Sequence, residues 1–405
     1  MEIDFSPLPT TARQGSVLFA TIAAGGSHVS TAEAMSQALE QAYPVTFDTR
    51  VTEPMVDFGF DELDRRHKEG WRRALRHPWT IVWGQRLIDA LPAATAAFHR
   101  RLLHDFAERA AQELNETRPA LVVVNHGWLT VAMTLAQRQF GLEAPVLTFE
   151  TSTLNANALW AEPLAERFVV ASPVSRRRLM RFGVPGSRID VVGYPVRQQF
   201  LCAPGKTEAR RRLALDEAFT CLVTLGGEGV GGTPEAVLEA LSDDPTTQVV
   251  VVTGRNEALR RRLAGFEERL PNLRVLGFVE ELADYVAACD VVIGKSGPAT
   301  VYETLAVGRP LLAPMRFGTA ENKMIGLLER HGLGRLVLTP AELRREVCNY
   351  RSDPDRLERV RLAAVRLDFP GMAARLGRYL GHYARTGQPA EDACGPGLEP
   401  LTGAK

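Results

Sequence analysis

The sequence predicts an α/β protein of two doubly wound domains that face a cleft. Short apolar runs recur through both halves of the chain, and most are separated by stretches long enough for helices, which is the pattern of parallel sheets covered on both faces. Glycine-rich segments follow several of these runs, and a polar stretch over 196–206 divides the two series. Because ligands in such sheets bind beyond the carboxyl ends of the strands, the loops after these runs are where function is expected.

The apolar runs set the expected elements. The first half opens with a strand over 17–23, which Gly25 and Gly26 close, and a helix over 30–41 capped by Ser30 or Thr31. Three more strands are predicted in this half, over 121–125, 146–149 and 168–171. In the second half, five strands are predicted over 221–225, 249–253, 273–276, 291–293 and 310–313. A helix is predicted over 258–268. Two domains of comparable size follow from this repetition.

Composition excludes several classes of protein. Lys and Arg total 48 and Asp and Glu total 48, so the overall charge gives no reason to expect a nucleic-acid partner. The five cysteines form no C-x-x-C pair, which argues against a disulfide framework and a structural zinc site and favours a reducing cytoplasm. Glu2 and Asp4 stand where a signal peptide carries positive charge, and the run Val17–Ala24 is too short to span a membrane. We therefore expect a cytoplasmic protein that is not transmembrane.

The strand expected at 221–225 leads into a glycine-rich loop. Residues 226–232 contain five glycines, Thr233 can cap the helix that follows, and Pro234 suits the first helical position. A glycine loop that feeds a helix N-terminus directs several backbone N–H groups at one point, which is a candidate anion site. The alternative interpretation is a flexible loop that needs glycine only for its backbone angles.

A second loop follows the strand expected at 291–293. Its Gly294-Lys295-Ser296 is not a phosphate-binding P-loop, because the glycine which that motif requires five positions earlier is Cys289 here. Gly297 and Pro298 open a helix, on which Thr300 and Glu303 share one face. A phosphate at this helix start would meet N–H groups, hydroxyls and the helix dipole, while Glu303 could bind ribose hydroxyls. The structural alternatives are a Thr300 hydroxyl bonded to its own helix and a solvated Glu303.

Four segments of the second half together resemble a known group of enzymes. Residues 226–229, 253–256, 277–279 and 295–303 are similar to the donor domain of the monogalactosyldiacylglycerol synthases and processive diacylglycerol glucosyltransferases of family 28. They are more distantly similar to the peptidoglycan lipid N-acetylglucosaminyltransferase. These enzymes share the GT-B fold of two Rossmann-like domains. The resemblance implies a domain order of an N-terminal acceptor domain (1–195), a linker (196–206), a UDP-sugar donor domain (207–368), a terminal helix that can return to the N-terminal domain (369–386) and a disordered tail (387–405).

The resemblance implies a donor site. Residues 277–279 would lie against uracil, 295–300 would border the diphosphate, and Glu303 would bind ribose. In the family a Gln-Glu pair followed by Asn reads the sugar, whereas this chain has Ala320-Glu321-Asn322, so the donor sugar stays open. The predicted donor residues are Gly226, Gly227, Glu228, Gly229, Arg255, Gly277, Phe278, Val279, Lys295, Ser296, Gly297, Pro298, Thr300, Glu303, Glu321 and Asn322.

The resemblance reaches the first half at residues 24–34. Gly25-Gly26-Ser27-His28 looks like the family's Gly-Gly-Gly-His loop, which implies that His28 takes the proton of the acceptor hydroxyl. A histidine has a pKa suited to this at neutral pH. Its alternative role is to bind a donor phosphate. The family's acceptor-side aspartate corresponds to Glu150, which is the second candidate for the base and follows another strand of the same sheet.

A basic segment with interleaved tryptophans lies between residues 65 and 86. It contains seven basic residues and one acid, and its candidate surface residues are Trp71, Arg72, Arg73, Arg76, Trp79 and Trp83. Arginine and tryptophan together suit an anionic membrane surface. The alternative is an ordinary amphipathic helix with its tryptophans in the core, interrupted by Pro78.

These features predict a glycosyltransferase of glycolipid biosynthesis. It would move a hexose with inversion from a UDP-sugar to a hydroxyl of a lipid such as diacylglycerol, peripheral on the inner face of the cell membrane. Lys295, the glycine loop and the helix start would neutralise the leaving UDP, so neither a metal nor another cofactor is expected. Two alternatives stay open, a UDP-sugar 2-epimerase and a catalytically silent nucleotide-sugar sensor.

Overall fold

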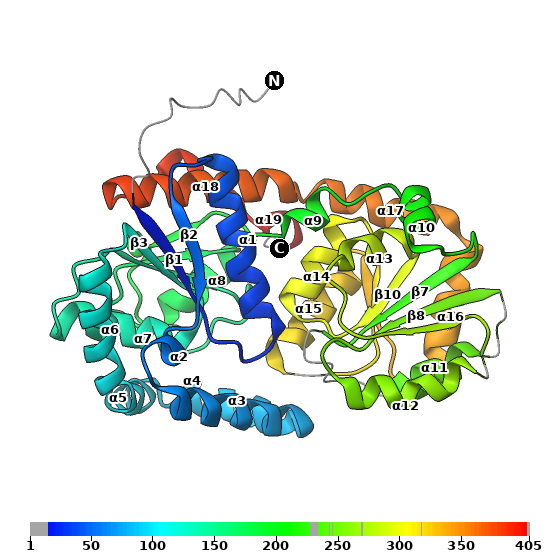
Figure 1. Cartoon of the computed structure of the whole chain (residues 1–405), viewed down its shortest axis with the longest axis horizontal. Helices are drawn as coiled ribbons and strands as arrows, with labels where there is room; N and C mark the ends of the chain where they lie inside the picture. The colour runs from blue at the N-terminus through cyan, green and yellow to red at the C-terminus, as the bar shows by residue number, and fades with distance from the viewer. Residues whose placement is uncertain are drawn as a thin grey trace.

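The computed structural model describes residues 15–226, 234–242, 244, 246–268, 270–316 and 318–402, arranged in two lobes (Figure 1). Each lobe is built on a six-stranded parallel sheet, with strand orders β2-β1-β3-β4-β5-β6 and β12-β11-β10-β7-β8-β9. Helices cover both faces of each sheet (Figure 1). The predicted class, two doubly wound α/β domains, is confirmed.

The strands follow the apolar runs. The N-terminal sheet contains β1 (Ser16–Ala20), β2 (Asp48–Thr52), β3 (Leu121–Val124), β4 (Val146–Glu150), β5 (Arg167–Val170) and β6 (Ile189–Val191). The C-terminal sheet contains β7 (Phe219–Thr224), β8 (Thr247–Val252), β9 (Leu273–Leu276), β10 (Val291–Gly294), β11 (Leu311–Ala313) and β12 (Gly334–Leu336). Strands β3, β4 and β10 are buried along their whole length, as central strands covered by helices on both faces must be.

The helices of the N-terminal lobe and linker include the ones that surround the predicted site. They are α1 (Gly26–Ala42), α2 (Pro54–Asp57), α3 (Asp61–Arg76), α4 (Pro78–Ala90), α5 (Pro92–Leu102), α6 (His104–Thr117), α7 (Gly127–Gln139), α8 (Pro173–Arg181), η1 (Gly186–Arg188) and α9 (Gln198–Leu201). As expected, Pro78 ends one helix and starts another, because its ring fits only the first turn.

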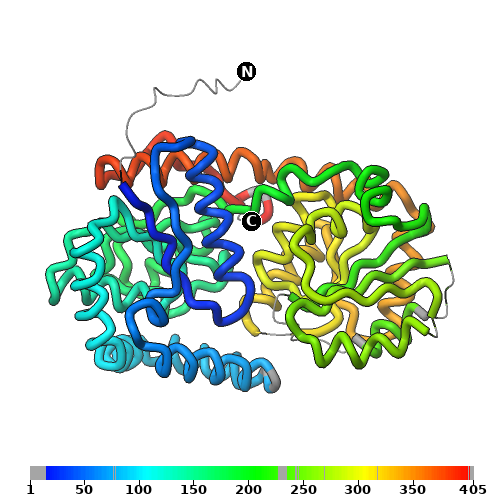
Figure 2. The backbone as a smooth tube through the Cα atoms, in the orientation of Figure 1, coloured from blue at the N-terminus to red at the C-terminus, as the bar shows by residue number. Residues whose placement is uncertain are grey.

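The rest of the chain forms the remaining helices. They are α10 (Lys206–Leu213), α11 (Pro234–Ser242), α12 (Glu257–Glu267), α13 (Leu282–Ala288), α14 (Pro298–Ala306), α15 (Thr319–Arg330), α16 (Pro340–Ser352), α17 (Pro354–Val365), α18 (Phe369–Thr386), η2 (Glu391–Ala393) and α19 (Glu399–Thr402). The last long helix, α18, crosses the top of the molecule and lies along α1 of the N-terminal lobe (Figures 1 and 2).

The predicted start of the first helix is wrong. Helix α1 begins at Gly26 with Gly25 as its N-cap, and Gly25 has φ 105°, a value that glycine tolerates and other residues rarely adopt. The chain therefore turns from strand to helix at once, and the Ser30 hydroxyl donates to the Gly26 carbonyl at 2.7 Å instead of capping. His28 consequently lies in the first turn of α1.

The expectation of a disordered tail from residue 387 is wrong for the described residues 388–402. Ala393 and Leu398 are fully buried, and the Leu398 N–H donates to the Ala171 carbonyl at 2.9 Å at the end of β5. On the other lobe, His331 Nε2 lies 2.9 Å from the Leu401 carbonyl. The glycines and prolines allow this segment to fit closely over both lobes, so their presence did not mean disorder.

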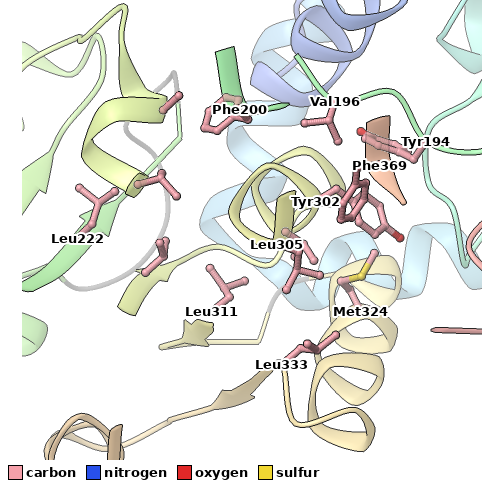
Figure 3. Close-up of a cluster of buried hydrophobic side chains, with 14 of the residues drawn as sticks. Tyr194, Val196, Phe200, Leu222, Tyr302, Leu305, Leu311, Met324, Leu333 and Phe369 are labelled. Atoms are coloured by element: carbon pink, nitrogen blue, oxygen red, sulfur yellow. The ribbon is translucent and has the colours of Figure 1, made fainter. Parts of the chain in front are cut away.

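An aromatic contact joins the two lobes behind the cleft. Tyr302 of α14 lies with its ring centroid 4.6 Å from that of Tyr194 and 6.0 Å from that of Phe369 at the start of α18 (Figure 3). The Tyr302 hydroxyl is 3.1 Å from Thr153 Oγ1 of the N-terminal lobe. Helix α14, which carries Pro298, Thr300 and Glu303 of the predicted donor residues, therefore packs against both lobes.

Candidate active site between the two domains

A cleft opens between the carboxyl ends of the two sheets. Its N-terminal wall consists of residues 23–27 and Ser30 with Lys68, Trp71, Arg72 and Leu75 of α3. Its C-terminal wall consists of residues 224–226, Val252, Gly254, Phe278, Val279, Leu282, Val286, Lys295, Gly297, Ala299, Thr300, Glu303 and Thr304, with Arg197 and Phe200 from the linker. The motifs predicted from the two halves thus face one another.

The start of α14 has a geometry that could hold an anion. Gly297 is its N-cap, Pro298 occupies the first turn, and both Gly297 and Thr300 line the cleft. A Cβ at Gly297 would lie only 3.5 Å from Ser27 Oγ, so the glycine turns of the two lobes nearly meet here. A helix N-terminus attracts negative charge, and this one is open to the cleft. Ser296 is buried, and its hydroxyl donates to the Glu321 carbonyl at 3.3 Å, so it supports the loop from behind.

Glu303 lies one turn deeper and is not a solvated residue. Its carboxylate is buried and accepts a hydrogen bond from Arg197 Nε at 2.7 Å, and Arg197 also approaches Glu33 of α1 at 3.6 Å. Burial raises the pKa of Glu303, and the Arg197 charge opposes that shift. The predicted ribose ligand is therefore held in place by a linker arginine before any ligand binds.

The predicted uracil contacts form the outer wall. Phe278 and Val279 line the cleft, and the Arg255 guanidinium lies 4.8 Å from the centre of the half-exposed Phe278 ring. Gly277 lies beside the stem of Arg260 rather than in the cleft lining. Of the glycine loop, Gly226 lines the cleft with φ 72°, whereas Gly227, Glu228 and Gly229 lie outside the described residues.

The predicted sugar-reading residues separate. Glu321 forms an ion pair with Lys295 at 3.4 Å, next to the start of α14. Asn322 instead lines a neighbouring hollow between the lobes, together with Gln85 and Asp89 of α4 and Lys323 of α15. The prediction that Asn322 shares the donor cleft is therefore not met, because successive helical residues point about 100° apart.

His28 is oriented as a base. Its Nδ1 lies 2.8 Å from the Asn125 carbonyl, so the neutral ring donates from Nδ1 and leaves Nε2 unprotonated. Asn125 Nδ2 in turn donates to the His28 carbonyl at 2.6 Å. Burial lowers the pKa of His28 to about 4, and the nearby His67 and Lys295 charges act in the same direction. The imidazole is therefore neutral at physiological pH.

The prediction that Glu150 opens onto the cleft is wrong. Glu150 is 0% exposed, and its carboxylate accepts hydrogen bonds from the Ser152 N–H at 2.7 Å and the Ser175 hydroxyl at 2.6 Å, as well as from the Ser152 hydroxyl. A carboxylate whose oxygens are all engaged inside the lobe fixes the loop after β4 and cannot reach an acceptor.

The basic tryptophan segment divides into two parts. Trp71 and Arg72 line the cleft, and a Cβ at Gly25 would lie 3.6 Å from the Trp71 indole nitrogen. Trp79 and Trp83 of α4 are 66% and 62% exposed, so the interpretation of the tryptophans as core residues is wrong for these two. Trp71 is partly buried against the core of the N-terminal lobe. The exposed Arg73 pairs with Glu69 at 3.3 Å; the side chain of Arg76 lies outside the described part of the chain.

A cluster of histidines beside His28 was not predicted. Four of the eight histidines form a chain of ring contacts. The ring of His28 lies 5.0 Å from that of His126, and the ring of His126 lies 5.1 Å from that of His67. Trp128 then contacts both His67 and His99. Among the described residues, no group of three or more His, Cys, Asp or Glu is placed to hold a metal ion. The cluster is a set of packed neutral rings.

These rings predict acid sensitivity of folding. Burial lowers the pKa of His67 to about 4 and that of His126 well below its usual value. Since a histidine in the unfolded chain has a pKa of about 6.5, the unfolded state binds more protons as the pH falls from 6.5 towards 4. We therefore expect the free energy of unfolding to decrease over this range, with a melting temperature several degrees lower at pH 5 than at pH 7.

Substitution tests the source of that acid sensitivity. His67→Phe should make the pH dependence of the melting temperature shallower, because it removes one group that the unfolded state protonates. His104→Phe is the matched control, since His104 is half exposed outside the cluster. Equal pH dependence in wild type and His67→Phe would show that the cluster does not control acid stability.

Two functional candidates escaped the sequence reasoning. Arg197 stands in the predicted linker but was given no role, because its partner Glu303 is 106 positions away. Lys68 reaches the cleft wall from α3 and is held by Asp64 at 2.7 Å. In the sequence, Arg197 is marked only by its place in the predicted linker, and Lys68 only by its place in the basic segment between residues 65 and 86.

Comparison with known proteins agrees with this geometry. Residues 220–325 match the model of the glycosyltransferase family 28 C-terminal domain. The matched range includes β10, α14 and the start of α15. The chain is 26% identical over 348 residues to the chloroplastic monogalactosyldiacylglycerol synthase 1 of Arabidopsis thaliana, covering 80% of this chain. It spans 63% of the length of that relative. The predicted resemblance is confirmed.

Solved structures with the same fold include transferases and epimerases. CalG4, the calicheamicin glycosyltransferase, superposes with a TM-score of 0.59 and 19% identity over 93% of this chain and 100% of its own. A UDP-GlcNAc 2-epimerase from Neisseria meningitidis bound to UDP-GlcNAc superposes with a TM-score of 0.57 and 14% identity, covering 91% of this chain and 98% of its own. These likenesses confirm the GT-B fold.

Proposed function

We propose that this chain, whose C-terminal lobe carries a glycosyltransferase family 28 domain, transfers a hexose from a UDP-sugar to a hydroxyl of a lipid acceptor such as diacylglycerol. The observation that carries the proposal is the meeting of the His28 turn and the α14 start across one cleft, where Ser27 Oγ would lie 3.5 Å from a Cβ at Gly297. One side offers a base and the other an anion site, which are the two groups that transfer from a nucleotide diphosphate requires.

The proposed step is a direct displacement. His28 Nε2 receives the proton of the acceptor hydroxyl while that oxygen forms a bond to the anomeric carbon. The bond from the anomeric carbon to the diphosphate oxygen breaks, and UDP leaves with the electron pair. Attack from the face opposite to UDP inverts the anomeric centre.

The charge that grows on UDP is met by the protein. Gly297 and Thr300 at the start of α14 line the cleft, and Lys295 and Arg197 place positive charge on its C-terminal wall. These groups support transfer without a metal ion. The same negative charge would raise the pKa of His28 above its value in the empty cleft, which favours proton uptake once the donor is bound.

Product analysis tests the proposed function. Purified protein, labelled UDP-glucose or UDP-galactose and diacylglycerol vesicles should yield a hexosyl lipid and UDP, both identified by mass spectrometry. Recovery of an epimerised nucleotide sugar would support the 2-epimerase alternative instead. Binding of UDP without turnover of any donor would support the sensor alternative.

We also propose that α4 and α5 dock on an anionic membrane surface. Trp79, Trp83 and Leu87 of α4 and its C-cap Leu91 are more than half exposed and recur every four residues, so they form one apolar stripe. Phe98 of the following helix α5 is also exposed, and the arginine-bearing α3 contacts α4. Exposed indoles flanked by arginines suit the headgroup level of an anionic bilayer. No helix among the described residues is long and apolar enough to cross a membrane.

Vesicle binding tests this surface. The double variant Trp79→Ser/Trp83→Ser should bind vesicles of phosphatidylcholine and phosphatidylglycerol at least about 10-fold more weakly, because two large apolar side chains no longer enter the bilayer. The binding of UDP should not change. Leu362→Ser/Val365→Ser is the matched control, since both residues are exposed on the distant α17.

Charge reversal supplies a second measurement on the same surface. Arg72→Glu/Arg73→Glu/Arg76→Glu should abolish cosedimentation with these anionic vesicles. Since Arg72 lines the cleft, a loss of UDP binding in this variant would report on the cleft and not on the membrane. Full vesicle binding by both sets of variants would contradict the docking proposal.

A further inference from the structure

His126 stands at the carboxyl end of β3, directly beside the candidate base. It is the N-cap of α7, and its Nδ1 accepts a hydrogen bond from the Trp128 N–H at 3.2 Å. The residue is only 8% exposed, and its side chain forms no other hydrogen bond within the part of the chain that the structure describes, whereas its carbonyl accepts from the Thr130 N–H and hydroxyl. The second ring nitrogen, Nε2, is therefore available to a ligand.

The cap fixes where the His126 proton lies. A neutral imidazole has one N–H and one acceptor nitrogen, so an Nδ1 that accepts from Trp128 places the proton on Nε2. His28 has the opposite tautomer, because its Nδ1 donates to the Asn125 carbonyl. The two rings, whose centroids lie 5.0 Å apart in an edge contact, thus differ in tautomer: Nε2 of His28 is bare and Nε2 of His126 carries the N–H.

The rings behind His126 restrict its orientation. His67 contacts His126 edge-on at 5.1 Å between ring centroids, and the Trp128 ring centroid lies 4.1 Å from that of His67 and 5.8 Å from that of His99. These contacts come from three elements, α3, α5 and α7. A ring that is capped at one nitrogen and packed against its neighbours is preorganised to present its other nitrogen in one direction.

We infer that His126 binds a second oxygen of the acceptor, next to the hydroxyl that reacts at His28. This inference rests on the proposed function and defines the acceptor more closely: it carries two oxygens on neighbouring carbons, as a glycerol backbone does. His28 Nε2 takes the proton of the reacting hydroxyl, and the His126 N–H is donated to the oxygen beside it. His126 is a specificity residue for the acceptor.

Variants that keep the helix cap test the inference. His126→Ser retains a capping oxygen but has no donor that reaches the acceptor, and His126→Asn retains a cap and an amide N–H. Two acceptors are compared, diacylglycerol and a long-chain primary alcohol that lacks the second oxygen. With diacylglycerol, His126→Ser should lower kcat/KM about 10-fold to 100-fold, mainly through the acceptor KM, and His126→Asn should lower it less.

The alcohol separates recognition from structure. It has no oxygen for His126 to bind, so wild type and His126→Ser should use it with equal kcat/KM, and the KM for the UDP-sugar should not change. An equal loss with both acceptors would show that His126 only supports the fold, and the inference would be wrong. Failure of the wild type to glycosylate either lipid would instead remove the proposed function and this inference with it.

Discussion

Glu303→Ala is expected to raise the dissociation constant for UDP about 30-fold to 1,000-fold, which corresponds to about 2 to 4 kcal/mol. The carboxylate is buried in the cleft wall and is aligned by Arg197 Nε at 2.7 Å, so two ribose hydroxyls would meet a charged acceptor that is already in place. Hydrogen bonds to a charged group are the strong ones. Isothermal titration calorimetry with UDP measures the effect.

Arg197 requires a control of its own. Glu303→Ala leaves this arginine without its nearer partner, which could weaken binding indirectly. Glu33→Ala removes the other acidic partner of Arg197, at 3.6 Å, and leaves the Glu303 carboxylate in place. If ribose contacts Glu303 directly, Glu33→Ala should change the dissociation constant little.

Acid pH supplies an independent test of Glu303. Because burial raises the pKa of this carboxyl, it becomes protonated at a higher pH than an exposed glutamate. UDP affinity should therefore decrease as the pH falls through that pKa, and Glu303→Gln should lose this pH dependence. A folded Glu303→Ala variant with wild-type affinity for UDP would remove Glu303 from the donor site.

The central strands could be predicted from the sequence because burial on both faces demands continuous apolar runs. Strands β3, β4 and β10 are of this kind. The edge strand β2 escaped prediction because its sequence Asp-Thr-Arg-Val-Thr is polar and it lies partly exposed. The other missed strands, β6 and β12, lie at sheet edges and contain three residues each, too few to show a period.

The site could be predicted where a short motif carries it and not where distant residues decide it. The α14 start and the turn before His28 are local patterns, and they face the same cleft. The position of Glu150 depends on Ser175, which lies 25 residues away on another element. The partner of Arg197 and the histidines that surround His126 likewise come from distant segments, which a linear pattern cannot bring together.

His28→Ala is expected to lower turnover about 10²-fold to 10⁴-fold, the range typical of a lost general base. The Asn125 carbonyl fixes the Nδ1 proton, so the ring offers Nε2 as a base in every molecule at neutral pH. Steady-state kinetics with saturating UDP-sugar measures turnover, and calorimetry with UDP measures donor affinity on the same preparation. Because the folded protein keeps Asn125 and the α1 start, a circular dichroism spectrum like that of wild type is expected.

The pH profile follows from the lowered pKa of His28. The base acts in its deprotonated form, so kcat/KM for the free enzyme should stay high as the pH falls and decrease only near a pKa of about 4. The acid limb of kcat should lie at higher pH, since the bound diphosphate raises the pKa of the imidazole. Coincident acid limbs would show that no negative charge reaches His28 from the donor.

The two observables for His28→Ala decide between its two roles. A base contributes in the transition state only, so turnover should fall while the dissociation constant for UDP stays within about 2-fold of wild type. A parallel loss of UDP affinity would identify His28 as a phosphate ligand instead. If both quantities stay normal, the base lies elsewhere, and Glu150 cannot replace His28 because its carboxylate is 0% exposed and bonded within the N-terminal lobe. The direct displacement proposed for this cleft would then lack its base and would be wrong.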